Sequence, residues 1–138
     1  MVAVLATALL AATITLVAPP QPALADGPVR AFLSWLKCFD ESEAFSDEPF
    51  VERDGTGFHS WSNVDGDGAP HYFLINQNQW FDADFLFIDL LEDDGQASED
   101  DYLGTFWVPR SHVDTGDHIT FVQGSGYKYE LRYFVFSS

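Results

Sequence analysis

The chain contains only one cysteine and only six basic residues among its 138 positions. A single cysteine excludes an intramolecular disulfide and any cysteine-rich zinc module. The six bases face 22 acidic residues, which gives a formal net charge of −16. Such a charge argues against nucleic-acid binding and against unassisted docking on an anionic bilayer. Cations, neutral sugars and basic proteins remain as partner classes.

Amphipathic helices are also missing after residue 26. Short aromatic and β-branched runs alternate there with Gly, Asp, Asn and Pro, a pattern typical of all-β proteins. Eight short strands within one small domain favour an eight-stranded antiparallel β-sandwich, with a closed barrel as the alternative. The expected strands cover residues 29–39, 49–53, 57–62, 70–76, 83–91, 102–109, 117–123 and 126–136.

The first 18 residues carry no charge. Prolines follow them, and then Ala23-Leu24-Ala25, which fits the A-x-A cleavage pattern of a secretory signal. The sequence therefore predicts a signal peptide over residues 1–25 and one secreted domain over 26–138. The run is not preceded by the Lys or Arg that a signal peptide usually carries at its start, and it is about one bilayer span long. An uncleaved membrane anchor is therefore the alternative.

Local patterns give further expectations for the core and the surface. Alternation in the last strand predicts one inward face and, opposite it, a face with Lys128, Glu130 and Arg132. The predicted inward face consists of Tyr127, Tyr129, Leu131, Tyr133 and Val135. The nearly continuous apolar run 85–91 predicts a central strand covered on both sides. Cys38 is expected to be a buried small hydrophobe. Trp80, among amides, is placed in a polar loop; a core position is preferred for its ring, and the alternative is an exposed platform for a sugar or protein.

The acidic residues gather in two segments. Residues 40–48 hold five of them and residues 92–101 hold six. Both segments fall between predicted strands, and a sandwich can bring them to the same end. Like charges held together repel, and Ca²⁺, which takes six to eight oxygen ligands, removes that cost. The alternative is a solvated acidic rim without metal.

These residues resemble the calcium loops of C2 domains. Phe39-Asp40 followed by residues 45–51 (FSDEPFV) is similar to the first loop, in which an Asp precedes an S-D-P-Y-V-like element. Residues 88–94 (IDLLEDD) and then 101–104 (DYLG) are similar to the other loop. The resemblance covers residues 29–109 and implies a C2-like sandwich with a Ca²⁺ site and no catalytic activity. Carried over by position, it implies five metal ligands: Asp40, Asp47, Glu92, Asp94 and Asp101.

The chain departs from the C2 pattern in three ways. Glu48 is inserted before Pro49, Glu92 stands where an Asp is usual, and the second loop is one residue longer. These changes can shift ligation toward Asp93 or Asp100. The six bases are spread along the sequence, so the basic patch that many C2 domains use for acidic lipids has no counterpart. Membrane contact is expected only through Ca²⁺ bridging.

Other motifs with chemical meaning are incomplete. Residues 63–68 (NVDGDG) match the start of an EF-hand loop, but its twelfth position is Leu74, so a tight acidic turn is predicted. The four histidines lack zinc spacing, although His112 and His118 flank a turn and could meet across a hairpin. No G-x-S-x-G or Cys–His signature is present.

The preferred interpretation is a secreted, non-catalytic module in which Ca²⁺ clamps two acidic loops and, if a coordination position stays open, bridges to a protein or carbohydrate ligand. One alternative is a metal-free acidic interaction or structural module. The other is a small carboxylate-dependent hydrolase, because 22 acids offer many carboxylate pairs.

Overall fold

A computed structural model describes residues 27–40, 48–61, 71–93 and 101–138, with the side chains of Asp40 and His71 outside that description. The predicted signal peptide and the EF-like turn at 63–68 lie outside these ranges. Within them the chain forms eight strands and one short 3₁₀ helix. These are β1 (Val29–Asp40), β2 (Pro49–Arg53), β3 (Thr56–Ser60), β4 (His71–Phe81), β5 (Phe85–Glu92), β6 (Asp101–Pro109), η1 (Arg110–His112), β7 (Asp117–Gln123) and β8 (Lys128–Phe136).

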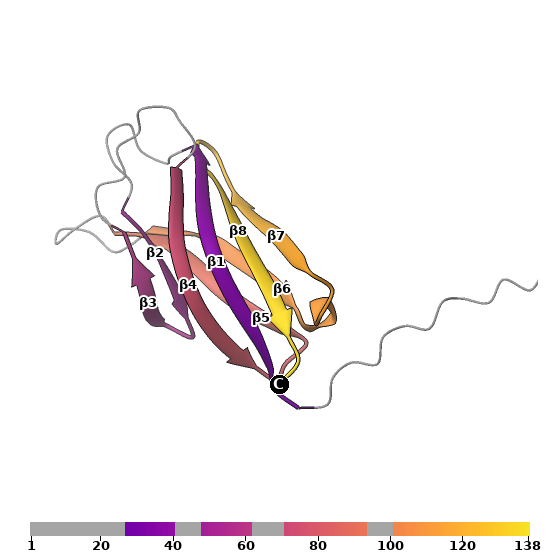
Figure 1. The fold of residues 1–138 in the computed structure, drawn as a ribbon. Coiled ribbons are helices and arrows are strands. Elements are labelled where there is room, and N and C mark those ends of the chain that lie inside the picture. The colour runs from indigo at the N-terminus through magenta and orange to yellow at the C-terminus, as the bar shows by residue number, and fades with distance from the viewer. Residues whose placement is uncertain (1–26, 41–47, 62–70, 94–100) are drawn as a thin grey trace, which may run out of the picture.

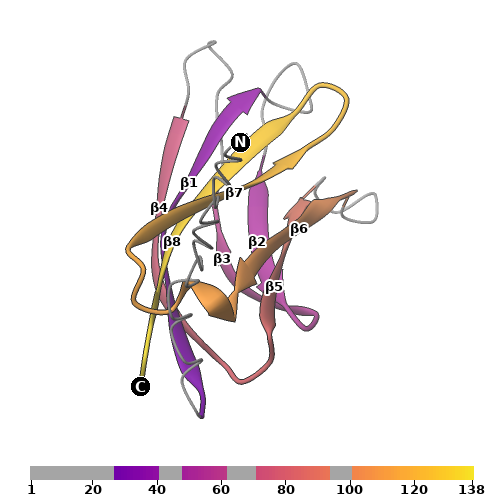
Figure 2. The same cartoon turned by 90° about the vertical axis from the view of Figure 1, so that its right-hand side faces the viewer.

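The strands form two four-stranded antiparallel sheets, with orders β4-β1-β8-β7 and β3-β2-β5-β6. Figure 1 shows β4, β1, β8 and β7 side by side across the front, and Figure 2 shows the two sheets as separate layers. The predicted eight-stranded antiparallel sandwich is confirmed. No helix in the described ranges is long and apolar enough to span a membrane.

The core lies between the inner faces of the two sheets. On β8 the alternation is strict: Tyr129, Leu131, Tyr133 and Val135 are at most 1% exposed. Tyr127, just before the strand, packs against the same core. The predicted inward face is therefore confirmed. Cys38 is 2% exposed, so its predicted burial is also confirmed.

One side of the sandwich is closed where β6 meets β7. A Cβ built on Gly104 would stand 2.7 Å from Cγ1 of Val122, which is itself buried. The Tyr127 hydroxyl donates a hydrogen bond of 2.7 Å to the carbonyl of Leu103. A glycine at 104 therefore lets the two sheets approach each other here.

Arg110 fixes the opposite end of β6. Its side chain is buried, and its guanidinium lies 3.0 Å from Asp82 and donates to the carbonyl of Gly27. Its backbone N–H donates to the carbonyl of Asp84. These bonds tie the β4–β5 connection and the start of the described chain to η1.

Two strand expectations were wrong. Residues 85–91 lie in the middle of their sheet but are covered on one side only, because Phe85 and Phe87 are 40% and 49% exposed. Strand β4 continues to Phe81 rather than ending at residue 76, so Trp80 lies in a strand paired with Arg30 and not in a loop. It is 52% exposed, so the preferred core position is wrong and the exposed alternative is correct. The amides at 77–79 are tolerated because β1 supplies backbone partners.

Candidate functional site

The register of β2, β5 and β6 brings the two acidic segments together. Glu92 lies opposite both Pro49 of β2 and Asp101 of β6. Just beyond, the Asp93 N–H donates a 3.1 Å hydrogen bond to the carbonyl of Glu48. The 40–48 segment therefore enters this sheet beside the point where the 92–101 segment leaves β5 and enters β6.

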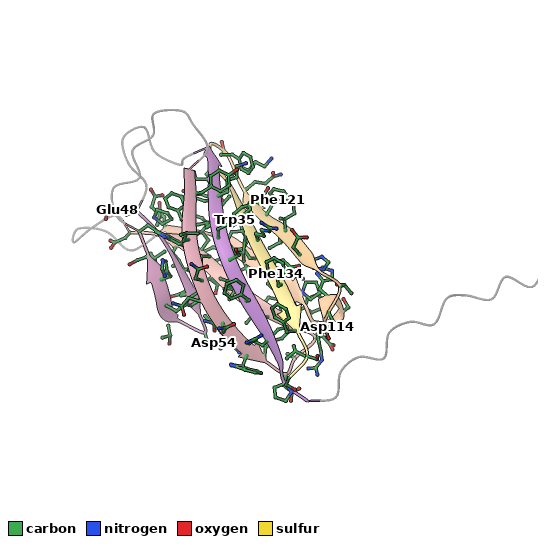
Figure 3. All side chains as sticks on the ribbon, viewed as in Figure 1. Trp35, Glu48, Asp54, Asp114, Phe121 and Phe134 are labelled. Atoms are coloured by element: carbon green, nitrogen blue, oxygen red, sulfur yellow. The ribbon has the colours of Figure 1, made fainter. Side chains whose placement is uncertain are left out.

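The other sheet contributes the end of β1. Figures 1 and 2 show that β1 ends toward the same end of the sandwich at which β2 begins and β5 ends. In Figure 3, Glu48 marks this end and Asp54 marks the other end of β2. We call the end formed by Asp40, Glu48, Glu92 and Asp101 the acidic end.

The five predicted ligands are described to different extents. Glu92 is 3% exposed and continues the inner face of β5, whereas its register partner Asp101 is exposed. Asp40 ends β1 with its side chain outside the description. Asp47 and Asp94 lie outside the described residues. The structure thus brings Glu92 and Asp101 together in register, and all five ligands stay predictions.

Within the described ranges, no group of three or more His, Cys, Asp or Glu side chains is arranged to hold a metal. The donor chemistry of the acidic end nevertheless fits Ca²⁺, because its described side chains offer carboxylate oxygens. Glu92 has the most constrained surroundings of them, because its strand is paired on both sides and its side chain is buried.

The two histidines expected to meet do so. The rings of His112 and His118 stack with 3.8 Å between centroids and 17° between planes. His112 Nδ1 lies 2.8 Å from the Tyr133 hydroxyl, and His118 Nε2 lies 2.8 Å from Thr115 Oγ1. Burial, and then the charge of His118, lower the pKa of His112. Burial raises the pKa of Tyr133 to about 12.

The basic residues are not spread in space as they are in sequence. Side chains on the outer face of β1 and β8 carry four of the six bases. Lys37 and Lys128 place their Nζ atoms 4.1 and 4.9 Å from the centroid of the Phe39 ring. The labelled Trp35 and Phe134 lie on this face in Figure 3, with Phe121 of β7 beside them. The four bases are Arg30, Lys37, Lys128 and Arg132.

A shallow hollow of about 560 Å³ lies beside β2 and β3, close to the acidic end. Its lining includes Phe50, Phe58, His59 and Asp93. The hollow is therefore lined by an imidazole, the Ser60 hydroxyl and a carboxylate, and the hydrolase alternative stays open.

Sequence reasoning missed an exposed aromatic group on the outer face of β5 and β6, formed by Phe85, Phe87 and Trp107. The apolar run 85–91 conceals the alternation that would have revealed it. The available signal was Trp107, an aromatic in the strand predicted to follow.

No protein-family model and no curated protein sequence matches the chain. A solved structure described as "Structure of a C2 domain" matches it with 14% sequence identity and a TM-score of 0.49, covering 78% of this chain and 96% of that one. The two four-stranded sheets follow from the strand pairing itself, and the resemblance to C2 domains stays a prediction. The match assigns no ligand to this chain.

Proposed function

We propose that the chain is a secreted, non-catalytic calcium-binding β-sandwich module in which Ca²⁺ clamps the two acidic segments. The supporting observation is the register in which Glu92 lies opposite Pro49 and Asp101, because it places the end of the 40–48 segment beside both ends of the 92–101 segment. The proposed ligands are Asp40, Asp47, Glu92, Asp94 and Asp101.

Charge gives the physical reason for an ion at this end. Residues 40–48 and 92–101 together hold 11 of the 22 acidic residues, five in one segment and six in the other. Their mutual repulsion opposes folding, and the cost grows as water is excluded. A hard cation with six to eight oxygen ligands relieves it, and a buried carboxylate such as Glu92 gives that ion a fixed anchor.

The module is proposed to act outside the cell after cleavage near Ala25. If a coordination position on the ion stays open, it can bridge to an anionic group of a ligand. Nucleic acid is not a proposed partner, since a charge of −16 repels it.

Calorimetric titration of the purified protein with Ca²⁺ and with Mg²⁺ tests the proposal. We expect Ca²⁺ to bind more tightly, because a wide carboxylate-rich site does not enforce the small octahedron that Mg²⁺ requires. Absence of binding by either ion would leave the metal-free acidic module as the better interpretation. A substrate screen that finds an activity lost on a single carboxylate substitution would favour the hydrolase.

A further inference from the structure

The outer face of β5 and β6 exposes three large aromatic rings. Phe85 and Phe87 alternate along β5 with the buried Leu86 and Ile88, and Trp107 lies opposite Phe87 on β6. Phe85, Phe87 and Trp107 are 40%, 49% and 55% exposed. Since the core is complete without them, these rings do not serve its packing.

The three rings form one continuous surface, which we call the aromatic platform (Phe85, Phe87 and Trp107). The Trp107 ring centroid lies 5.9 Å from that of Phe85 and 5.4 Å from that of Phe87. The two phenylalanine rings are 6.2 Å apart and within 28° of parallel. Contiguous exposed apolar area of this kind marks interaction sites more often than isolated exposed residues do.

Hydrogen-bonding groups adjoin the platform at its end nearer the acidic end. Asp89 and Thr105 are register partners two residues beyond Phe87 and Trp107 on the same face. The Thr105 hydroxyl donates to Asp89 Oδ1 at 2.5 Å, and the Tyr102 hydroxyl lies 2.5 Å from Thr105 Oγ1. Because Thr105 has one hydroxyl hydrogen, which Asp89 accepts, Tyr102 donates to Thr105. The groups left for a ligand are therefore acceptors: the carboxylate of Asp89 and the phenol oxygen of Tyr102.

A flat apolar surface beside acceptors suits a ligand with an apolar C–H face and hydroxyl donors at its edge. Saccharide rings combine these two properties: the C–H face stacks on aromatic rings while the hydroxyls donate to a carboxylate. From Phe85 to Asp89 the strip runs about 13 Å along the strand, at about 3.3 Å per residue. That length suits a short stretch of a polysaccharide.

Charge distinguishes neutral from anionic sugars. All six basic residues are described, and each contacts an aromatic ring or a carboxylate outside the platform. Four lie on the outer face of the other sheet. Arg53 pairs with Asp54 and donates to the Trp80 carbonyl, and Arg110 is buried against Asp82. An anionic ligand would meet Asp89 and a net charge of −16 without a compensating cation, a cost that a neutral ligand avoids.

We infer that the outer face of β5 and β6 binds a neutral polysaccharide, with Phe85, Phe87 and Trp107 stacking on the sugar rings and Asp89 accepting a hydroxyl hydrogen. This face is distinct from the acidic end, so the inference does not rest on calcium binding.

Affinity gel electrophoresis of the full chain tests the inference. The gels contain neutral soluble polysaccharides, namely a β-1,4-glucan, a β-1,3-glucan, a xylan and a galactomannan, and the carboxymethylated form of the same β-1,4-glucan. At least one neutral polymer should retard the protein, equally in EDTA and in Ca²⁺, and carboxymethylation should reduce the retardation. Retardation in EDTA separates this inference from the calcium proposal.

Trp80, a sugar-platform candidate from the sequence, provides a matched control, because it is 52% exposed but belongs to β4 in the other sheet, where the inference assigns it no sugar contact. Trp107→Ala should weaken binding by about tenfold or more, equivalent to about 1.4 kcal/mol, whereas Trp80→Ala should leave it unchanged. Phe87→Ser provides a second variant should Trp107→Ala not fold.

Three results would overturn the inference. One is retardation by none of the neutral polymers, and another is equal loss in Trp107→Ala and Trp80→Ala. The third is binding only to a cationic probe such as polylysine, which would make the platform a surface for basic proteins.

Discussion

The imidazole rings of His112 and His118 stack face to face, 3.8 Å apart, at the junction of η1 and β7. Protonating both rings would place two positive charges in contact. The neighbouring Tyr133 hydroxyl, 2.8 Å from His112 Nδ1, stays protonated at neutral pH because burial raises its pKa to about 12. The Tyr133 hydroxyl therefore contributes no change of charge near neutral pH.

This cluster predicts a pH-dependent stability. The pKa of His112 is lowered in the folded state from 6.5, first by burial and then by His118, so the unfolded chain binds a proton more readily. Stability is then complete above about pH 6.5 and is lost as the pH falls from there through the lowered pKa of His112. Thermal melting between pH 7 and pH 5.5 should show this loss, and His112→Asn should reduce its slope. An unchanged slope in the variant would contradict the assignment.

The contact between Gly104 and Val122 predicts an intolerant position. Gly104 has a φ of 150°, and an added Cβ would meet buried Val122 at 2.7 Å. Gly104→Ala should therefore cost about 1–3 kcal/mol of unfolding free energy through overpacking, measured by urea denaturation. Gly57→Ala is the control, because nothing lies within 4 Å of its Cβ position, and it should change stability far less. Similar losses in the two variants would show that the contact is not what restricts position 104.

The alternation of β8 predicts unequal effects for two neighbours. Leu131 is fully buried between β1 and β7, so Leu131→Ala should cost about 2–5 kcal/mol. Glu130 points to the opposite face, and Glu130→Ala should change stability by only about 0.5 kcal/mol or less. Chemical denaturation of both variants measures the difference, and equal effects would refute the inward face assigned to β8.

Much of the fold could be predicted because alternation and turn residues act locally. The strict pattern around Leu131 specified β8, and Asp54-Gly55, both with positive φ, gave the β2–β3 hairpin turn. Trp80 was misplaced because the polar amides before it indicate a loop unless the pairing with β1 is known.

The groups of side chains that meet on the surface could be predicted only with the register of the strand pairs. Arg30 and Lys128 lie far apart in sequence, and only the β1–β8 pairing places them on one face. The aromatic platform was hidden because an apolar run of inward and outward residues has no visible period. The acidic end was anticipated because long acidic segments are expected in the connections between strands. The structure brings the two segments together because β2, which follows the first segment, pairs with β5, which precedes the second.

Export gives a prediction that depends on the first 25 residues. Cleavage after Ala25 should leave Asp26 as the first residue, since small residues at positions 23 and 25 fit a signal peptidase. Intact-mass measurement on secreted material decides this. A mass that includes residues 1–25 would instead support the membrane anchor.

The ion site predicts a selective stabilisation by calcium. Binding to the folded state alone adds about 2.7 kcal/mol when the free ion is 100 times its dissociation constant. Melting temperature should therefore rise in millimolar Ca²⁺ and respond much less to NaCl at matched ionic strength, because screening relieves repulsion without forming ligand bonds. Asp94→Asn removes a proposed ligand and should abolish most of the rise, while Asp65→Asn, in the incomplete EF-like turn, should preserve it. Equal stabilisation by NaCl and Ca²⁺, or identical behaviour of the two variants, would mean that the acidic residues form a solvated rim, because only a defined ligand set makes one carboxylate matter more than another.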